Sequence, residues 1–158
     1  MNARLSRPAS SAIAVRADLP RTGSLDRAAL ERLAQTEVTQ EHDGVAHRYR
    51  GVLLDAVLRD FGFSEGRSQR EVPGAQKRNG WRKVVVATGA DGYQAAFSCA
   101  ELSSDMGCTS ALLAYAVDDH ALPDGEGPFR LIVSTDRKGA RSVRNLIALE
   151  VVDAGRRE

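Results

Sequence analysis

The sequence predicts an α+β domain built on mixed or antiparallel sheets with short helices. Three observations carry this prediction. Short apolar segments typical of strands recur along the 158 residues, and several of them are joined by turn signals typical of hairpins. Helical periodicity is confined to short segments. No regular alternation of strand and helix is present, which argues against a doubly wound parallel sheet.

The N-terminal part is expected to hold a strand, a helix and a hairpin. Residues 12–19, AIAVRADL, are the expected strand. Ser24 is expected to cap a short amphipathic helix over residues 25–33, where apolar side chains recur at helical spacing. The segments TEVTQ and VAHRYRG then flank Asp43 and Gly44, a dipeptide that predicts a hairpin turn.

The middle of the chain combines the clearest helix signal with a long polar segment. Residues 51–62, GVLLDAVLRDFG, place their apolar side chains on one broad helical face, and Gly62 is the expected C-cap. Residues 66–83 carry six basic side chains against the single Glu71, and Pro73 and several glycines interrupt any period. This segment is expected to be a long, mobile surface loop.

The second half of the chain is predicted to be mostly strands. Residues 83–97, KVVVATGADGYQAAF, read as a hairpin with its turn at residues 89–92. Ser98 and Glu101 have the spacing of a capping box, which predicts a short helix over residues 99–105. The apolar runs ALLAYAV, FRLIVS and LIALEVV are the remaining expected strands, separated by an acidic turn and a basic segment.

Length and charge limit the classes of partner. The length is that of one domain, which we place at residues 25–152. Residues 1–24 are then an N-terminal tail and first strand, and residues 153–158 a C-terminal tail. With 22 Lys and Arg against 21 Asp and Glu, the net charge of +1 gives no general attraction to nucleic acid or to a membrane surface.

No apolar run approaches the roughly 20 residues of a membrane span, and the first residues lack the apolar core of a signal peptide. The sequence therefore predicts a soluble protein. It leaves the compartment open, because a periplasmic protein whose leader has been removed would look the same as a cytoplasmic one.

The common local signatures of hydrolases, nucleotide-binding enzymes and zinc sites are missing from the sequence. Cys99 and Cys108 fit no zinc or CxxC spacing and are expected to be buried thiols, with a disulfide as the alternative in an exported protein. His42, His47 and His120 are more simply explained as solvated or hydrogen-bonded side chains than as metal ligands. We therefore assign no catalytic and no metal-binding residue.

The segment TDRKGARSVRNL, residues 135–146, holds four basic side chains within eight positions. One interpretation is an ordinary solvated turn. The other is an anion site, because Gly139 allows close backbone approach and Arg141 and Arg144 are forked donors that suit phosphate oxygens. A third role for Arg141 is internal pairing with Asp136 or Glu150. Spacing alone does not choose between them.

Four segments taken in order resemble the oxidoreductase molybdopterin-binding domain of the sulfite-oxidase-like superfamily, in particular its small single-domain pterin-binding members. They are YRGVLLDAVLRDFG, KVVVATGADGYQAAFSCAEL, LLAYAVDDHALPDGEGPFRLIVS and GARSVRNLIALEVV. The likeness extends over residues 25–152. It implies a mixed α+β domain that holds a molybdenum-pterin cofactor.

The resemblance also implies roles for the basic segment, which in the related enzymes helps to hold the pterin phosphate. Arg141 and Arg144 would be the charged ligands, while Ser142 and Val143 would offer backbone N–H groups. The candidate cofactor-binding residues are Lys138, Gly139, Arg141, Ser142, Val143, Arg144 and His42.

The chain departs from those enzymes at the metal. Their molybdenum is held by a cysteine thiolate that aligns with residues 40–43, where this chain has no cysteine. Molybdopterin is therefore the implied cofactor, whereas molybdenum is not expected.

Three functions stay open. The first is a module that binds a pterin or another anionic, phosphate-bearing small molecule and does not catalyse oxo-transfer alone. The second is a molybdenum-dependent oxidoreductase that tolerates the missing thiolate or recruits Cys99. The third is a cofactor-free domain that binds a partner, with the basic loop of residues 66–83 as its cue. A redox partner protein is a further candidate partner.

Overall fold

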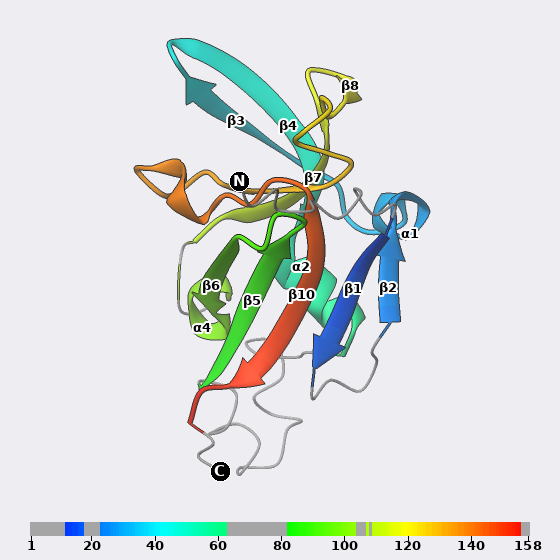
Figure 1. The fold of residues 1–158 in the computed structure, drawn as a ribbon, viewed down its shortest axis with the longest axis vertical. Coiled ribbons are helices and arrows are strands. Elements are labelled where there is room, and N and C mark those ends of the chain that lie inside the picture. Colours follow the sequence, from blue (N-terminus) through cyan, green and yellow to red (C-terminus); the bar gives the residue numbers. More distant parts are fainter. Residues whose placement is uncertain (1–11, 18–22, 63–81, 104–106, 108, 156–158) are drawn as a thin grey trace, which may run out of the picture.

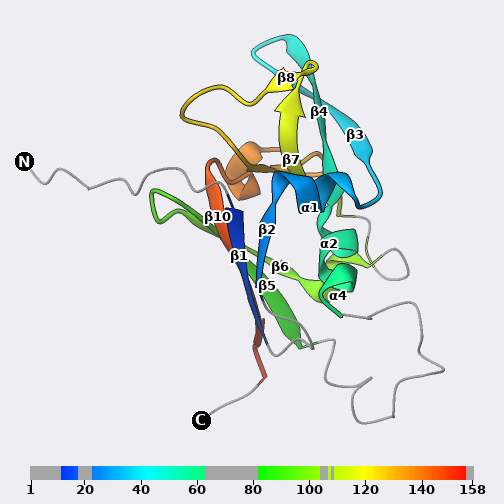
Figure 2. The ribbon, with the colours of Figure 1, turned by 90° about the vertical axis from the view of Figure 1, so that its right-hand side faces the viewer.

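The computed structural model describes residues 12–17, 23–62, 82–103, 107 and 109–155. They form two five-stranded sheets with short helices beside them (Figures 1 and 2). One sheet contains a parallel pair of strands among antiparallel ones, and the other is antiparallel. The predicted α+β class with mixed or antiparallel sheets is confirmed.

The first sheet has the strand order β2-β1-β10-β5-β6. The last strand, β10, lies at its centre, parallel to β1 and antiparallel to β5, so the first and last described strands pair in one sheet. The strands are β1 Ala12–Ala17, β2 Gly23–Asp26, β5 Lys83–Gly89, β6 Gln94–Ser98 and β10 Leu146–Asp153.

The second sheet has the order β3-β4-β7-β8, and β9 also pairs with β7. Its β3–β4 hairpin and the short β8 extend from one end of the molecule (Figures 1 and 2). The strands are β3 Thr36–His42, β4 Val45–Leu53, β7 Ala111–Val117, β8 His120–Ala121 and β9 Arg130–Val133.

Local turn and cap chemistry behaves as the sequence predicts. Asp43 and Gly44 both have positive φ, 50° and 77°, as a two-residue turn that follows the strand twist requires. Ser98 forms the predicted capping box with Glu101 at the start of α4 (Cys99–Leu102). Cys99 is buried in this helix, whereas Cys108 lies outside the described residues, so the disulfide alternative is not tested.

Two predicted helix starts are wrong because strand pairing extends further than expected. Ser24 is not a cap: it lies in β2, and Asp26 caps α1 (Arg27–Glu31) by accepting a hydrogen bond of 2.8 Å from the Ala29 N–H. The next predicted helix begins only after β4, so α2 is Leu54–Asp60. Gly62 follows it with φ of 95°, as its predicted capping role requires.

Residues 63–81, which make up most of the predicted basic loop, lie outside the described residues. Residues 18–19 and 104–106, at the ends of a predicted strand and a predicted helix, lie outside them as well. Within the described part of the chain, no helix is long and apolar enough to cross a membrane.

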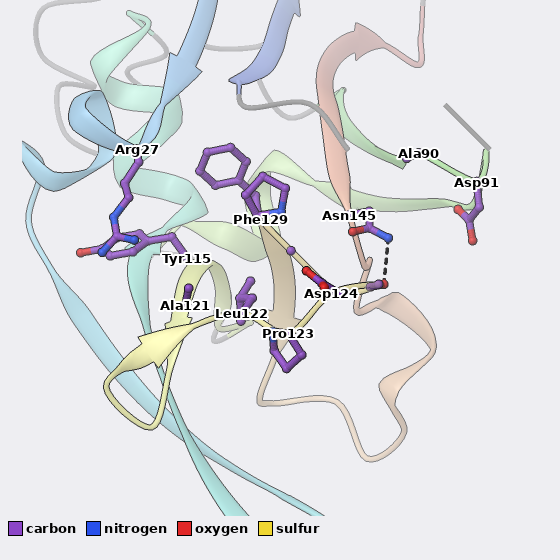
Figure 3. Close-up of a pocket in the computed structure, with 13 residues that line it drawn as sticks. Arg27, Ala90, Asp91, Tyr115, Ala121, Leu122, Pro123, Asp124, Phe129 and Asn145 are labelled. Carbon is purple, nitrogen blue, oxygen red and sulfur yellow. Dashed lines mark hydrogen bonds between the residues drawn. The ribbon is translucent and has the colours of Figure 1, made fainter. Parts of the chain in front are cut away.

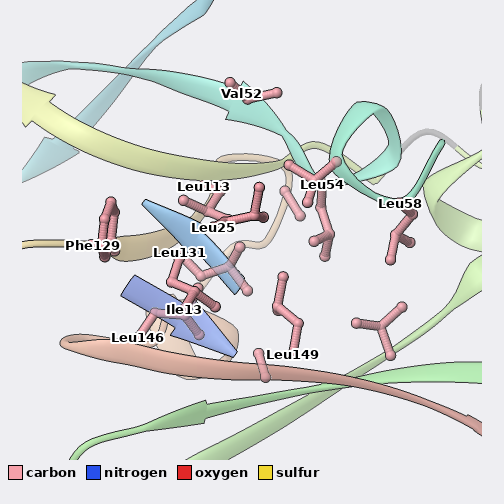
Figure 4. Packing of buried hydrophobic residues seen from close by; sticks show 14 of the residues in the cluster. Ile13, Leu25, Val52, Leu54, Leu58, Leu113, Phe129, Leu131, Leu146 and Leu149 are labelled. Atoms are coloured by element: carbon pink, nitrogen blue, oxygen red, sulfur yellow. The ribbon is translucent and has the colours of Figure 1, made fainter. Parts of the chain in front are cut away.

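The main core fills the space between the two sheets (Figure 4). Ile13, Leu146 and Leu149 from the first sheet and Leu113 and Leu131 from the second are each at most 1% exposed. The helices α2 and α4 contact each other and lie on the same side of the first sheet (Figure 2). A smaller apolar cluster lies on the other face of β7, which explains why ALLAYAV is apolar without alternation.

Gly51 marks the closest approach of two strands, where β4 has an irregular register against β7. A Cβ atom at this position would lie 1.9 Å from the Leu113 carbonyl oxygen and 2.7 Å from the Ala114 Cα. We therefore expect Gly51→Ala to lower the free energy of unfolding by at least about 2 kcal/mol, since backbone has to move. The matched control is Gly139→Ala, where nothing lies within 4 Å of the added methyl. Urea denaturation of both variants checks this, and equal stabilities would contradict it.

Candidate functional site

The basic segment is anchored by a pair of backbone hydrogen bonds between buried residues. The Leu131 N–H donates to the Val143 carbonyl at 2.8 Å, and the Val143 N–H donates to the Leu131 carbonyl at 3.0 Å. Between them, the chain leaves β9, forms a 3₁₀ turn at Gly139–Arg141 and returns to β10. The ends of the segment are therefore fixed, and its middle is exposed.

Arg141 is held inside this segment by two carboxylates. Its Nε and Nη2 donate to the two oxygens of Asp136, each at 2.8 Å, and its Nη1 donates to Glu101 Oε1 at 2.7 Å. The guanidinium also lies over the Phe97 ring, 4.8 Å from its centroid. The internal pairing with Asp136, one of the alternatives for Arg141, is thus present, and Glu101 adds a second partner that sequence reasoning missed.

These contacts keep all three groups charged. The hydrogen bond from Arg141 lowers the pKa of Asp136. Burial alone would raise the pKa of Glu101, but hydrogen bonds from Arg141, the Ser98 backbone and Thr109 outweigh it, so that this pKa is lowered. The hydrogen bond to Asp136 is in turn the largest cause of the raised pKa of Arg141. Arg141, Asp136 and Glu101 thus form an ion-pair cluster that links the basic segment to α4.

The predicted backbone donors already have acceptors. The Ser142 N–H donates to the Gly139 carbonyl at 3.1 Å, and the Val143 N–H is used in the bridge to Leu131. The Ser142 Oγ accepts from the Val133 N–H at 3.2 Å. An anion would have to displace these bonds to use those groups.

Lys138 and Arg144 are in a different situation. Both are exposed, and within the described residues neither side chain has an ion pair or a hydrogen bond. Gly139 between them is also exposed, with open space around it. Of the predicted cofactor-binding residues, Lys138 and Arg144 are the ones that present free positive charge.

The structure does not bring His42 to this segment. His42 ends β3 at the tip of the extended hairpin, 77% of its side chain is exposed, and its Nε2 lies 3.3 Å from the Asp43 carboxylate. The tip lies apart from the basic segment (Figures 1 and 2). Among the described residues, no group of three or more His, Cys, Asp and Glu side chains could hold a metal ion.

A cleft of about 540 Å³ lies where the β5–β6 turn, the loop before β9 and the start of α1 come together (Figure 3). Leu122, Tyr115 and Phe129 form much of its apolar wall. The guanidinium of Arg27 lies over the Tyr115 ring, 5.0 Å from its centroid. Sequence reasoning missed this cleft, because its residues come from segments far apart in the chain.

Asn145 joins the walls of the cleft to the basic segment. Its N–H donates to the Glu126 carbonyl at 2.8 Å, its Nδ2 donates to the Gly125 carbonyl at 2.8 Å, and its carbonyl accepts from the Ala90 N–H at 2.9 Å. It adopts a positive φ of 48°, which asparagine tolerates better than most residues. An asparagine directly before an apolar strand is the signal that could have pointed to this position.

Comparison with known proteins defines the class. The model of the family "Oxidoreductase molybdopterin binding domain" matches residues 16–158, and the chain belongs to this family. The predicted resemblance is confirmed. A search of curated proteins finds no match.

The fold also matches that of a solved structure, the sulfane dehydrogenase SoxCD from Paracoccus pantotrophus, with a TM-score of 0.66 and 17% sequence identity. The match covers 92% of this chain and 39% of that chain. This chain therefore spans about two-fifths of the larger chain, and at this identity the likeness establishes the fold alone.

The ion-pair cluster of Arg141, Asp136 and Glu101 should make the loss of stability in Arg141→Ala depend on pH. We expect the substitution to cost about 1 to 2 kcal/mol at neutral pH, after allowance for solvent screening of partly exposed groups. Because the pKa values of Asp136 and Glu101 are lowered in the folded protein, their contribution is present above their unfolded pKa values and disappears as the pH falls through the folded ones.

Melting temperatures of the wild type and Arg141→Ala between pH 7 and pH about 2.5 test this expectation. The difference should be largest near pH 7 and shrink on acidification. Arg141→Lys should recover little, since an ammonium cannot reproduce the forked contacts. A melting-temperature difference that is independent of pH would contradict a stabilising role for the ion-pair cluster.

Proposed function

We propose that this chain is a ligand-binding member of its family that takes a phosphate-bearing pterin, or a similar anionic molecule, and does not catalyse oxo-transfer alone. The observation that carries the proposal is a set of exposed cations in the basic segment, Arg137, Lys138 and Arg144, none of which has a partner among the described residues. Lys138 and Arg144 are the two of these that are among the candidate cofactor-binding residues. Arg144 directly precedes Asn145, which lines the cleft. Phosphate charge and a ring in the cleft can therefore belong to one ligand.

In this proposal Arg141 and Arg144 have different roles. Arg141 is engaged by Asp136 and Glu101, so its role in the proposal is to hold the segment in shape. Arg144 and Lys138 supply the charge that attracts phosphate, because no carboxylate among the described residues neutralises them.

The described residues fit the pterin part of the family's cofactor. A cleft of about 540 Å³ is in the usual range for a small-molecule site. Asn145 Oδ1 is a buried acceptor with no hydrogen-bond partner among the described residues, and a pterin ring carries N–H donors on its edge. This chain's residues would hold and orient the pterin.

The described residues do not fit the molybdenum. Residues 40–43 form the exposed tip of a hairpin and contain no cysteine. Cys99 is only 2% exposed and is not among the residues that line the cleft. A soft, high-valent metal needs a thiolate, and none of the residues that line the cleft is a cysteine. Any oxidation would then need a redox partner protein, which we include in the proposal.

Removal of the free cations should weaken binding of a phosphate-bearing pterin. With neopterin monophosphate as the probe, Lys138→Ala and Arg144→Ala should each cost about 1 to 2 kcal/mol of binding free energy, because each removes a charge-assisted contact. The loss should shrink at high salt. Isothermal titration calorimetry measures it, with phosphate-free neopterin as the matched ligand.

The control variant is Arg16→Ala, which removes an exposed cation from β1 in the first sheet. It should bind neopterin monophosphate as the wild type does. Equal affinities for both ligands, or equal losses in all three variants, would overturn the phosphate site.

A further inference from the structure

The charges around the cleft are those of a site for N–H groups. Two carboxylates, Asp91 and Asp124, line it against a single guanidinium, that of Arg27. Arg27 Nε donates to Glu31 at 2.8 Å, so part of its charge is already neutralised. Arg27 and Asp91 lie at opposite ends of the cleft, and Asp124 lies between them (Figure 3). Among the described residues, no cation pairs with Asp124.

The backbone around the cleft offers few donors. Pro123 and Pro128 carry no N–H. The N–H groups of Ala90 and Gly127 already donate to the carbonyls of Asn145 and Pro123, at 2.9 Å and 3.1 Å. An oxyanion in the cleft would therefore meet carboxylates and find few free donors.

Asn145 adds an unused acceptor. The amide orientation is fixed by the Gly125 carbonyl, which only accepts and so must face the Nδ2. Oδ1 is left buried and without a partner among the described residues. An unpaired buried acceptor is costly, and a ligand N–H that reached it after a small local adjustment would relieve that cost.

The apolar wall limits the rest of the ligand. Leu122, Phe129 and Tyr115 line the cleft with apolar side chains that are 8%, 1% and 6% exposed, and the Tyr115 ring already carries the Arg27 guanidinium. A flat ring buries well against such a wall, and a planar N–H group attached to it can form two parallel bonds to one carboxylate.

We propose that this cleft binds a small aromatic ligand through an amidine-type group, a planar group with two or more N–H donors, and discriminates against aromatic carboxylates. Asp124 and Asp91 carry the charge recognition, and Asn145 Oδ1 accepts a further N–H. The inference deepens the proposed function, because it concerns the cleft in which the pterin ring would lie, but it needs no phosphate on the ligand.

Three probes of the same shape test it: benzamidine, benzamide and benzoate. Affinities are measured by NMR titration of the whole chain, with dissociation constants up to about 10 mM in range. Benzamidine should bind tightest and benzoate weakest, with at least a tenfold difference between them. Benzoate binding as tightly as benzamidine, or no binding by any of the three, would overturn the proposal.

Variants then separate the cleft from the rest of the surface. Asp124→Asn should weaken benzamidine three- to tenfold and leave benzamide nearly unchanged, because it removes charge and keeps shape. Glu41→Gln, which removes an exposed carboxylate from the distant β3, should change neither. Arg16→Ala, which removes an exposed cation from β1, should leave benzamidine binding intact. Because benzamidine carries no phosphate, its binding can persist even if the phosphate site is wrong. An equal loss of affinity in Glu41→Gln and Asp124→Asn would contradict recognition of benzamidine in the cleft.

Discussion

The reciprocal backbone pairing of Leu131 and Val143 is the constraint on which the site depends. Leu131 belongs to β9 in the second sheet, and Val143 leads into β10 at the centre of the first. Both side chains are fully buried, so this bridge joins the two sheets within the core. It holds the start of β10 in place and positions Asn145 against the loop that forms the cleft. The basic segment is the exposed excursion between two fixed ends.

In the proposed site, Arg141 has a structural role, whereas Lys138 and Arg144 bind the ligand. The Arg141 guanidinium contacts two carboxylates and an aromatic ring, so it has few donors left for a ligand. Its contacts instead hold the basic segment in place. The neighbouring Lys138 and Arg144 keep their charge accessible. A rigid segment with free cations loses less entropy on binding than a mobile one, which favours affinity.

Sequence reasoning predicts local features here better than the site. The Asp43-Gly44 turn and the Ser98 capping box are decided by nearby residues, and both were predicted correctly. Ser24 failed as a helix cap because the pairing of β2 with β1 competes with helix formation, and this pairing is tertiary.

The site, too, depends on tertiary contacts that the local sequence does not predict. The basic segment is visible in the sequence, but the choice between a ligand contact and internal pairing for Arg141 depends on where the fold places Asp136 and Glu101. Glu101 is forty positions away in the chain. The cleft has no sequence signature, because Arg27, Tyr115 and Asn145 meet only in the folded chain. The family was recognisable because the order of four segments carries more information than any single motif, and the family match supports it.

The central claim is that the chain binds the organic part of the family's cofactor without its metal. The most direct measurement is native mass spectrometry, together with metal analysis, of protein purified from a host that makes molybdopterin. The account predicts a bound pterin and far less than one molybdenum per chain. About one molybdenum per chain would contradict it, and a chain that carries neither pterin nor metal would contradict the binding role itself.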